Sequence, residues 1–598
     1  MILGLIGLAA WAFQAAPSPA AAVIQDLTFS SVVMHGTQSY RVFLPPAYAG
    51  SQKRYPVIYW FHGYEPSNQQ RDTEIAGYVA AHEVIVVDEG PVETTGPFPS
   101  YFPELANHID QTLRTIADRD HRGVTGFSMG GFMAYWIAGE YPDRVSSASS
   151  FMGFTEASVG PPDLDLENRL DDLYGNYDAV RTRLVTGTRD FLQFYHRRLN
   201  GIWLSARSGH ETESFDADHG APGIAKTLDF HMQAFANPLP KPPAFYHADA
   251  YPNFTVWGWE AVSDRKQPGF TILENVSPKG FRSAVRQWVP GGATIPAVKL
   301  SIASATLFVP GTSHAVTYIR LRDRKARRAM QKADAQGRLS FDLDGDAYEV
   351  GISAEPQLTV TGYQIADAGW ATAGQPVKLR VAFLNKGQAR SSTTAIKWES
   401  PNPGVTFDVP SSRLFGLGPG ESAELPVTVT AAGEAQAMVK IFAVEGANRM
   451  PFEVPLYPAA PAVQNFHIAD GQTLEAWRHA VARSEVTLGE GNGDGHAAPG
   501  ESFAVLLPDG EFLRAAELFT NDACVDNTMR ASDSWADYDH AGASAVYSLP
   551  AIRADCPPGH VVHMLARVVV PNAPNHQVRY AAIEFPVWWQ SGHEPKKP

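Results

Sequence analysis

A chain of 598 residues is too long for one hydrophobic core and predicts several domains. An apolar fraction of 44% with 19% charged residues is typical of folded globular protein and excludes a disordered chain. The net charge of −15 argues against a nucleic-acid or anionic-membrane partner, because either would need a basic face.

Residues 1–22 resemble a cleaved signal peptide. The run Ile2 to Phe13 is apolar, and small residues follow at Ala15-Ala16 and Ala20-Ala21-Ala22. Because the apolar run is too short to span a bilayer, we expect export to the periplasm or the extracellular space without a transmembrane anchor. No Lys or Arg precedes the run, so a misassigned start stays open as the alternative.

Residues 24–236 alternate between strand-like and helix-like runs. Val57–Phe61 and Val84–Val87 are continuous apolar runs, typical of strands buried on both faces of a parallel sheet. Repeated strand–helix units of this kind predict an α/β domain with a doubly wound sheet. Further strands are expected at 145–152, 184–186 and 211–215, and helices at 101–118, 132–140, 191–203 and 221–235.

Composition changes at the Pro-rich stretch Asn237–Pro243, which suits a stiff linker. Beyond it, short alternating strands are punctuated by Gly, Pro, Asn and Asp, a pattern typical of β-sandwiches. We therefore predict three β-modules: a β-rich module at 244–354, an Ig-like sandwich at 357–458, and a C-terminal sandwich at 462–590.

Two local patterns in the first of these modules favour structure over binding. The basic run Arg320–Arg328 alternates with apolar residues and indicates the solvated face of a strand pair. Asp344-Gly345 predicts a hairpin turn between two strand-like runs, which makes the neighbouring aspartates turn residues and not metal ligands.

Cys524 and Cys556 are the chain's two cysteines. In an exported chain they predict one disulfide, which would stabilise the fold by about 3–4 kcal/mol. Two cysteines alone cannot make a zinc site.

Ser128 is the predicted nucleophile. The segment Gly126-Phe127-Ser128-Met129-Gly130-Gly131 follows a strand-like run and opens a helix-like one, which is the context of a nucleophile elbow. Glycine at 126 and 130 leaves room for the sharp turn. The helix that begins there points its free N–H groups at an oxyanion formed beside the serine.

A serine needs a base, and the base needs a carboxylate to fix its tautomer. In this fold the chain order is serine, acid, histidine, each at the carboxyl end of a strand. Asp190 follows the strand at 184–186, and His219 follows the strand at 211–215. Asp216 and Asp218 flank His219, but a loop neighbour rarely folds back onto the same imidazole, so Asp190 is favoured as the acid.

Two other histidines are weaker candidates for the catalytic base. His210 lies at the opposite end of its strand, and His196 lies in the middle of a helix.

The oxyanion hole needs two N–H donors. The N–H of Met129 supplies the first oxyanion donor, and Tyr64, after the strand Val57–Phe61, is the best candidate for the second. The neighbouring His62 is interpreted as a structural residue.

The N-terminal 240 residues resemble the putative-esterase family of α/β-hydrolases, which includes esterase D, feruloyl and acetylxylan esterases and the antigen 85 mycolyltransferases. The resemblance rests on Arg54-Tyr55-Pro56 leading to His62-Gly63, on Leu105–Asp118 with Arg122–Gly131, and on Gly187-Thr188-Arg189-Asp190. It implies that Ser128, Asp190 and His219 are nucleophile, acid and base.

A loop in the C-terminal module offers a candidate calcium site. Glu490, Asn492, Asp494 and Glu501 stand at EF-hand positions 1, 3, 5 and 12, with Gly495 at position 6. Pro499 and strand-like flanks depart from that motif, so a plain Gly-rich turn between domains stays open.

These patterns predict an exported serine carboxylesterase that uses no catalytic cofactor and acts on small-molecule or polysaccharide-linked esters. The segment Glu89–Tyr101 is expected to lie over the site and shape specificity. Acyl transfer and peptide hydrolysis on the same fold are alternatives. Another is a carbohydrate- or surface-binding protein with an inactive hydrolase domain, since Trp257, Trp259, Trp588 and Trp589 could stack on sugars.

Overall fold

The structure is a computed structural model that describes residues 21–63, 69–89, 98–206, 209–366, 369–432, 437–475, 485–509, 511–514, 517–526, 530–533, 545–557, 559–569 and 578–588. The predicted signal peptide, save its last two residues, lies outside these ranges and stays a prediction. In the described part of the chain, no helix is both long and apolar enough to cross a membrane.

An eight-stranded sheet forms the centre of the N-terminal α/β domain, in the order β1-β2-β4-β3-β5-β6-β9-β10. Six strands of this sheet, β3, β4, β5, β6, β9 and β10, run parallel, and the β1–β2 hairpin joins β4 antiparallel. The strands are β1 (Val23–Ser31), β2 (Gly36–Leu44), β3 (Val57–Phe61), β4 (Ile85–Glu89), β5 (Arg122–Phe127), β6 (Ser147–Phe151), β9 (Arg181–Gly187) and β10 (His210–Phe215).

Helices cover both faces of this sheet, which confirms the predicted doubly wound α/β class. One core packs α2, α3 and α4 against the sheet, and a second core packs α1 and α5 against the opposite face. The helices are α1 (Gln69–Ala81), α2 (Phe98–Thr112), α3 (Met129–Glu140), α4 (Gln193–Ala206) and α5 (Ile224–Ala236), with short 3₁₀ helices η1 (Arg119–His121) and η2 (Leu170–Tyr177). The hairpin β7 (Glu156–Val159) and β8 (Leu166–Arg169) was not expected from sequence.

Residues 245–352, the first β-module, form two sheets around one apolar core. The larger sheet has the order β11-β14-β15-β20-β17-β18 and the smaller one β12-β13-β16-β19. The strands are β11 (Phe245–Asp249), β12 (Asn253–Val256), β13 (Trp259–Ser263), β14 (Phe270–Ser277), β15 (Gly280–Arg286), β16 (Leu300–Ala303), β17 (Ser313–Arg320), β18 (Ala326–Lys332), β19 (Ser340–Leu343) and β20 (Tyr348–Ile352).

One turn prediction in this module is wrong. Asp344-Gly345 connects β19 to β20, and these two strands belong to different sheets instead of pairing as a hairpin. Gly345 lies so close to Ile295 that a Cβ would stand 1.9 Å from its carbonyl oxygen, so packing fixes this glycine. The basic run Arg320–Arg328 does lie on the β17–β18 strand pair, with residues 321–328 exposed or half-buried.

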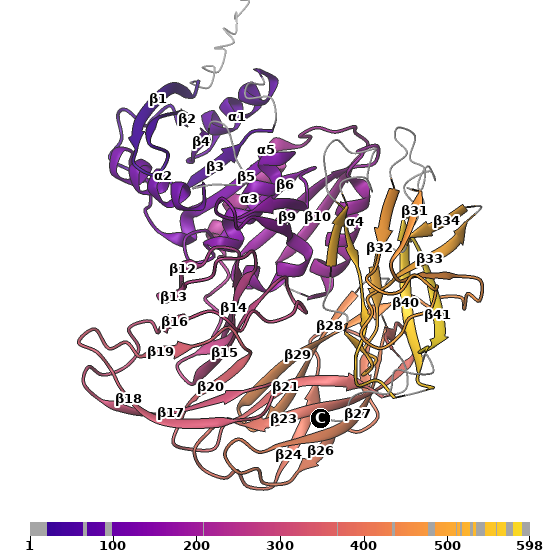
Figure 1. Cartoon of the computed structure of the whole chain (residues 1–598). Helices are drawn as coiled ribbons and strands as arrows, with labels where there is room; N and C mark the ends of the chain where they lie inside the picture. The colour runs from indigo at the N-terminus through magenta and orange to yellow at the C-terminus, as the bar shows by residue number, and fades with distance from the viewer. Residues whose placement is uncertain are drawn as a thin grey trace, which may run out of the picture.

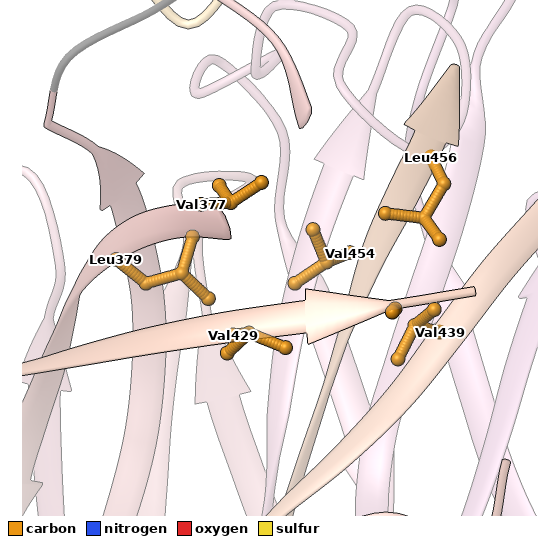
Figure 2. Close-up of a pocket in the computed structure, with 7 residues that line it drawn as sticks. Val377, Leu379, Val429, Val439, Val454 and Leu456 are labelled. Carbon is orange, nitrogen blue, oxygen red and sulfur yellow. The ribbon is translucent and has the colours of Figure 1, made fainter. Parts of the chain in front are cut away.

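Residues 358–457, the second β-module, also form two sheets around one core, in the orders β21-β23-β27-β25 and β22-β29-β28-β24-β26. Val377, Leu379, Val429, Val439 and Val454 line a cavity of about 10 Å³ between the sheets (Figure 2), at the lower limit for one water molecule. With an all-apolar lining, it is a packing gap. The strands are β21 (Leu358–Ile365), β22 (Ala371–Thr372), β23 (Pro376–Asn385), β24 (Thr394–Glu399), β25 (Val405–Phe407), β26 (Ser411–Leu414), β27 (Ser422–Ala431), β28 (Ala437–Glu445) and β29 (Asn448–Tyr457).

Residues 467–586, the third β-module, form several small sheets, of which β30-β33-β34 and β35-β40-β41 are the largest. The predicted disulfide is present: Cys524 and Cys556 are bonded, with their Cα atoms 5.1 Å apart. The strands are β30 (His467–Ala469), β31 (Gln472–Glu475), β32 (Glu485–Leu488), β33 (Ala504–Asp509), β34 (Glu511–Arg514), β35 (Glu517–Phe519), β36 (Val525–Asp526), β37 (Arg530–Asp533), β38 (Ala545–Ser548), β39 (Ala551–Ile552), β40 (Val561–Val569) and β41 (Val578–Pro586).

The tryptophans proposed from sequence as sugar platforms lie in different settings. Trp259 is buried in the core of the first module. Trp257 is half-buried, with Arg119 and Lys241 over its ring. Trp588 is exposed at one edge and stacks on His496 at 4.3 Å. Trp589 lies outside the described residues.

All three modules contact the N-terminal domain, which lies above the first two modules and beside the third in Figure 1. The first module shares its core, since Ala248, Phe270 and Ile272 belong to the same apolar cluster as α3. The second reaches α4, where Ser205 accepts a hydrogen bond from the Met438 N–H at 2.7 Å. The third contributes Glu517, which pairs with Arg169 at 2.6 Å.

Candidate active site

Ser128 stands on a sharp turn between β5 and α3. Its φ of 55° lies in the left-handed region, and its N–H donates to Phe151 O at 3.0 Å. The turn brings backbone atoms so close that a Cβ on Gly126 would lie 2.2 Å from Gly130 O. A Cβ on Gly130 would lie 2.1 Å from Phe61 O. The elbow therefore needs glycine at both positions.

His219 links the serine to a buried carboxylate. Its Nε2 lies 3.0 Å from the Ser128 hydroxyl, and its Nδ1 lies 3.0 Å from Asp190 Oδ1. The Asp190 side chain is fully buried, whereas that of His219 is 22% exposed. With Nδ1–H donating to the carboxylate, Nε2 is left unprotonated and able to accept the serine proton.

The parallel sheet explains why three side chains from distant parts of the chain meet. Ser128 follows β5, Asp190 follows β9, and His219 follows β10. Carboxyl ends of parallel strands lie on one edge of a sheet, so the loops after them converge. Sequence reasoning predicted this convergence, and the catalytic roles of the three residues stay predictions.

The competing aspartates have another partner. Arg189 forms ion pairs with both Asp216 and Asp218, whose side chains are about 80% exposed. His210, the other histidine near the strand, hydrogen-bonds Thr182 and Asn200 at the opposite end of β10.

His196, which the sequence analysis placed in the middle of a helix and set aside, lies beside Asp190. It lies in the first turn of α4, where its Nε2 donates to Gly153 O at 2.9 Å. Its Nδ1 faces Asp190 Oδ2 at 3.7 Å, and both atoms are buried without a hydrogen-bond partner. Burial lowers the pKa of His196, although the Asp190 carboxylate opposes that shift.

The two predicted oxyanion donors have different outcomes. Met129 is the first residue of α3, so its N–H belongs to the helix end that has no intrahelical acceptor. Tyr64 lies outside the described residues. Gly63 beside it is close to the nucleophile, since a Cβ there would lie 3.3 Å from Ser128 Cβ. His62 is buried and its Nδ1 donates to Gly63 O at 2.6 Å, which fits its structural interpretation.

Aromatic rings enclose the imidazole. Phe127 and Phe191 lie 4.8 Å and 4.6 Å from the His219 ring. Most of the segment predicted to cover the site, residues 90–97, lies outside the described residues. At its end, Tyr101 and Phe102 are buried in the core between α2 and the sheet.

The candidate calcium loop folds around one buried carboxylate. Asp470, which the sequence did not single out, accepts backbone N–H bonds from Gly493, Asp494 and Gly495. Glu501 accepts from the N–H groups of Asn492 and Ala498. Asn492 donates to Asp494 at 3.1 Å, and the Glu490 N–H donates to Ser502. Calcium binding by Glu490, Asn492, Asp494 and Glu501 stays a prediction.

Part of the chain is similar to known proteins. Residues 102–225 match the family described as "Putative esterase". The protein named Esterase Rv1288 of Mycobacterium tuberculosis is 36% identical over 128 residues, which are 19% of this chain and 28% of that protein's own length. The chain therefore spans under a third of that relative.

Solved structures similar to the N-terminal part include a ferulic acid esterase. It is 19% identical, and the match covers 36% of this chain and 98% of that one at a TM-score of 0.30. Another is FphF, a fluorophosphonate-binding serine hydrolase of Staphylococcus aureus, 18% identical with 36% and 99% covered at a TM-score of 0.31.

Proposed function

We propose that this chain, whose residues 102–225 match the family described as "Putative esterase", is an exported serine carboxylic-ester hydrolase. The observation that carries the proposal is the chain of contacts from Ser128 through His219 to Asp190, with both links at 3.0 Å. The disulfide supports export, because such bonds persist in oxidising compartments.

In the proposed reaction, Ser128 attacks the ester carbonyl while His219 Nε2 takes the hydroxyl proton. The Met129 N–H, with a donor proposed at Tyr64, stabilises the negative oxygen of the tetrahedral intermediate. The imidazolium then protonates the departing alcohol, and the acyl group stays on the serine. Water, activated by the same imidazole, cleaves that acyl-enzyme. We propose small or carbohydrate-linked acyl esters as substrates, with no catalytic cofactor.

The test is hydrolysis of p-nitrophenyl acetate by the full-length chain, followed by a panel of acetyl, feruloyl and longer acyl esters. Ser128→Ala should lower kcat at least about 10⁴-fold, because the nucleophile is lost. Ser158→Ala, at a serine that hydrogen-bonds Asp165 on the β7–β8 hairpin, is the control.

The same assay tests the acid. Asp190→Asn should lower kcat by about 10³- to 10⁴-fold, since the imidazole loses its tautomer-fixing partner. Asp216→Asn, an exposed aspartate that pairs with Arg189, should leave kcat within about twofold of wild type. Equal losses of kcat in both variants would show that Asp190 is not the catalytic acid. No turnover by the wild-type chain would favour the alternative of a binding protein with an inactive hydrolase domain. Added alcohol acceptors and aminoacyl substrates distinguish acyl transfer and peptide hydrolysis.

A further inference from the structure

A buried cluster of three ionisable side chains lies where the first β-module meets helix α3. Glu140 is the last residue of α3, and His247 and Asp249 lie on β11. One ligand atom from each side chain lies within 4.8 Å of the others. His247 and Asp249 are two residues apart on a strand, so they face the same side, toward the helix.

This cluster is almost entirely removed from water. His247 is 0% exposed, Asp249 1% and Glu140 8%. Both ring nitrogens of His247 lack a hydrogen-bond partner, although Nε2 lies 3.5 Å from Asp249 Oδ2. A buried imidazole without any partner is costly, because it has lost its bonds to water and gained none in return.

The two carboxyl groups have hydrogen-bond partners, which include a side-chain hydrogen bond between Glu140 and Asp249 themselves. Trp136 Nε1 donates to Glu140 Oε1 at 3.2 Å, and the Tyr251 N–H donates to Asp249 Oδ1 at 2.7 Å. Burial raises the pKa of Glu140, and the neighbouring Asp249 raises it further. Arg265 is buried nearby, but its guanidinium donates to the carbonyls of Gln267 and Ala250.

We propose that Glu140, His247 and Asp249 bind a structural Zn²⁺ ion between the N-terminal domain and the first β-module. Two carboxylates and a neutral imidazole carry a charge of −2, which one divalent cation neutralises. One imidazole with two carboxylates is a ligand set that zinc accepts. Calcium and magnesium prefer sites made of oxygen alone, so the histidine disfavours them.

The ion would act in structure and not in catalysis. Helix α3 has 12 residues, which corresponds to a length of about 18 Å, and Ser128 and Glu140 are at its opposite ends. A zinc ion at Glu140 would therefore fix the end of the nucleophile helix against β11 from the far side of the domain.

The test measures metal content and thermal stability of the full-length chain, purified without chelators. We expect about one Zn²⁺ per chain by elemental analysis, and a Tm that falls after dialysis against a chelator and recovers with ZnCl₂. Glu140→Gln and His247→Gln should each lower zinc affinity at least about tenfold. X-ray absorption at the zinc edge should show only nitrogen and oxygen ligands.

Asp522→Asn is the matched control, because Asp522 and His560 form the other described acid–histidine cluster, whose cysteine is in the disulfide. It should retain zinc. Absence of zinc together with an unchanged Tm on ZnCl₂ addition would overturn the proposal. The proposal would also be overturned if Glu140→Gln and His247→Gln bound zinc as tightly as the wild-type chain does. A Glu140→Gln chain that is as stable as wild type or more so, and free of zinc dependence, would instead indicate two carboxyl groups sharing a proton.

Discussion

Ser128, His219 and Asp190 form one chain of contacts, and His196 packs against the second oxygen of the Asp190 carboxylate. The positions of the first three follow from local sequence. A glycine-framed turn identifies the serine, and a strand followed by a loop identifies the other two. His196 could not be identified in this way, since its contact with Asp190 depends on how α4 packs over Gly153. Chain order therefore predicts the reacting groups, and tertiary packing determines what holds them in place.

At the residue scale, we expect His196→Ala to lower kcat about tenfold with KM nearly unchanged. Asp190 would lose the side chain packed against its second oxygen, and a small shift of the carboxylate misplaces the imidazole. His196→Gln keeps an N–H donor at the position of Nε2, within reach of Gly153 O, and should restore part of the rate.

Steady-state kinetics with p-nitrophenyl acetate on variants of equal Tm provide the measurement. His210→Ala, at the opposite end of the sheet, is the control. A kcat within twofold of wild type for His196→Ala would show that Asp190 is positioned without this histidine.

At the element scale, prediction succeeded where both faces of an element are buried. The apolar run of β3 was predicted residue for residue, because a strand inside a parallel sheet needs no alternation. The β7–β8 hairpin, which lies between β6 and β9 in the chain, was missed because its short strands show no distinct alternation of apolar and polar residues. Asp344-Gly345 failed as a hairpin because the partners of β19 and β20 are distant strands.

Helix α5 packs against the sheet through His231, a fully buried histidine. Its ring nitrogens contact Ser147 Oγ at 2.8 Å and Ser149 Oγ at 2.9 Å. Burial lowers its pKa from 6.5 to about 3. Below pH 6.5 the unfolded chain therefore takes up a proton that the folded chain refuses until about pH 3.

The free energy of unfolding should consequently decrease as the pH is lowered from 6.5 toward 3. His231 contributes up to about 1.4 kcal/mol of this decrease for each pH unit. His231→Gln should show a shallower dependence, measured by denaturant unfolding between pH 4 and pH 7. His563→Gln, at an exposed histidine, should keep the wild-type slope. Parallel curves for His231→Gln and wild type would contradict this assignment.

At the scale of the whole molecule, an ionic network joins the third β-module to the N-terminal domain. Glu517 pairs with Arg169 at 2.6 Å, with Arg567 at 2.8 Å and with Arg198 at 3.5 Å. All four side chains are at most 10% exposed. This network could not be predicted from the sequence, because Glu517 lies 348 residues from Arg169 along the chain.

Glu517→Gln should lower the free energy of unfolding by about 3–5 kcal/mol, since it removes a buried carboxylate that three arginines share. Denaturant unfolding measures the loss. Glu421→Gln, which breaks an exposed pair with Arg390, should cost less than about 1 kcal/mol. Similar small costs in both variants would mean that neighbouring acids compensate the arginines.

The Pro-rich stretch at 237–243 connects two parts that share a hydrophobic core. Ala248, Phe270 and Ile272 belong to the cluster that includes Phe132 and Trp136 of α3. A fragment that ends at this stretch would expose the apolar residues of α3 to solvent, and an exposed apolar patch of this kind promotes self-association. The N-terminal domain should therefore not be soluble when it is expressed alone, because the first β-module covers part of its apolar surface.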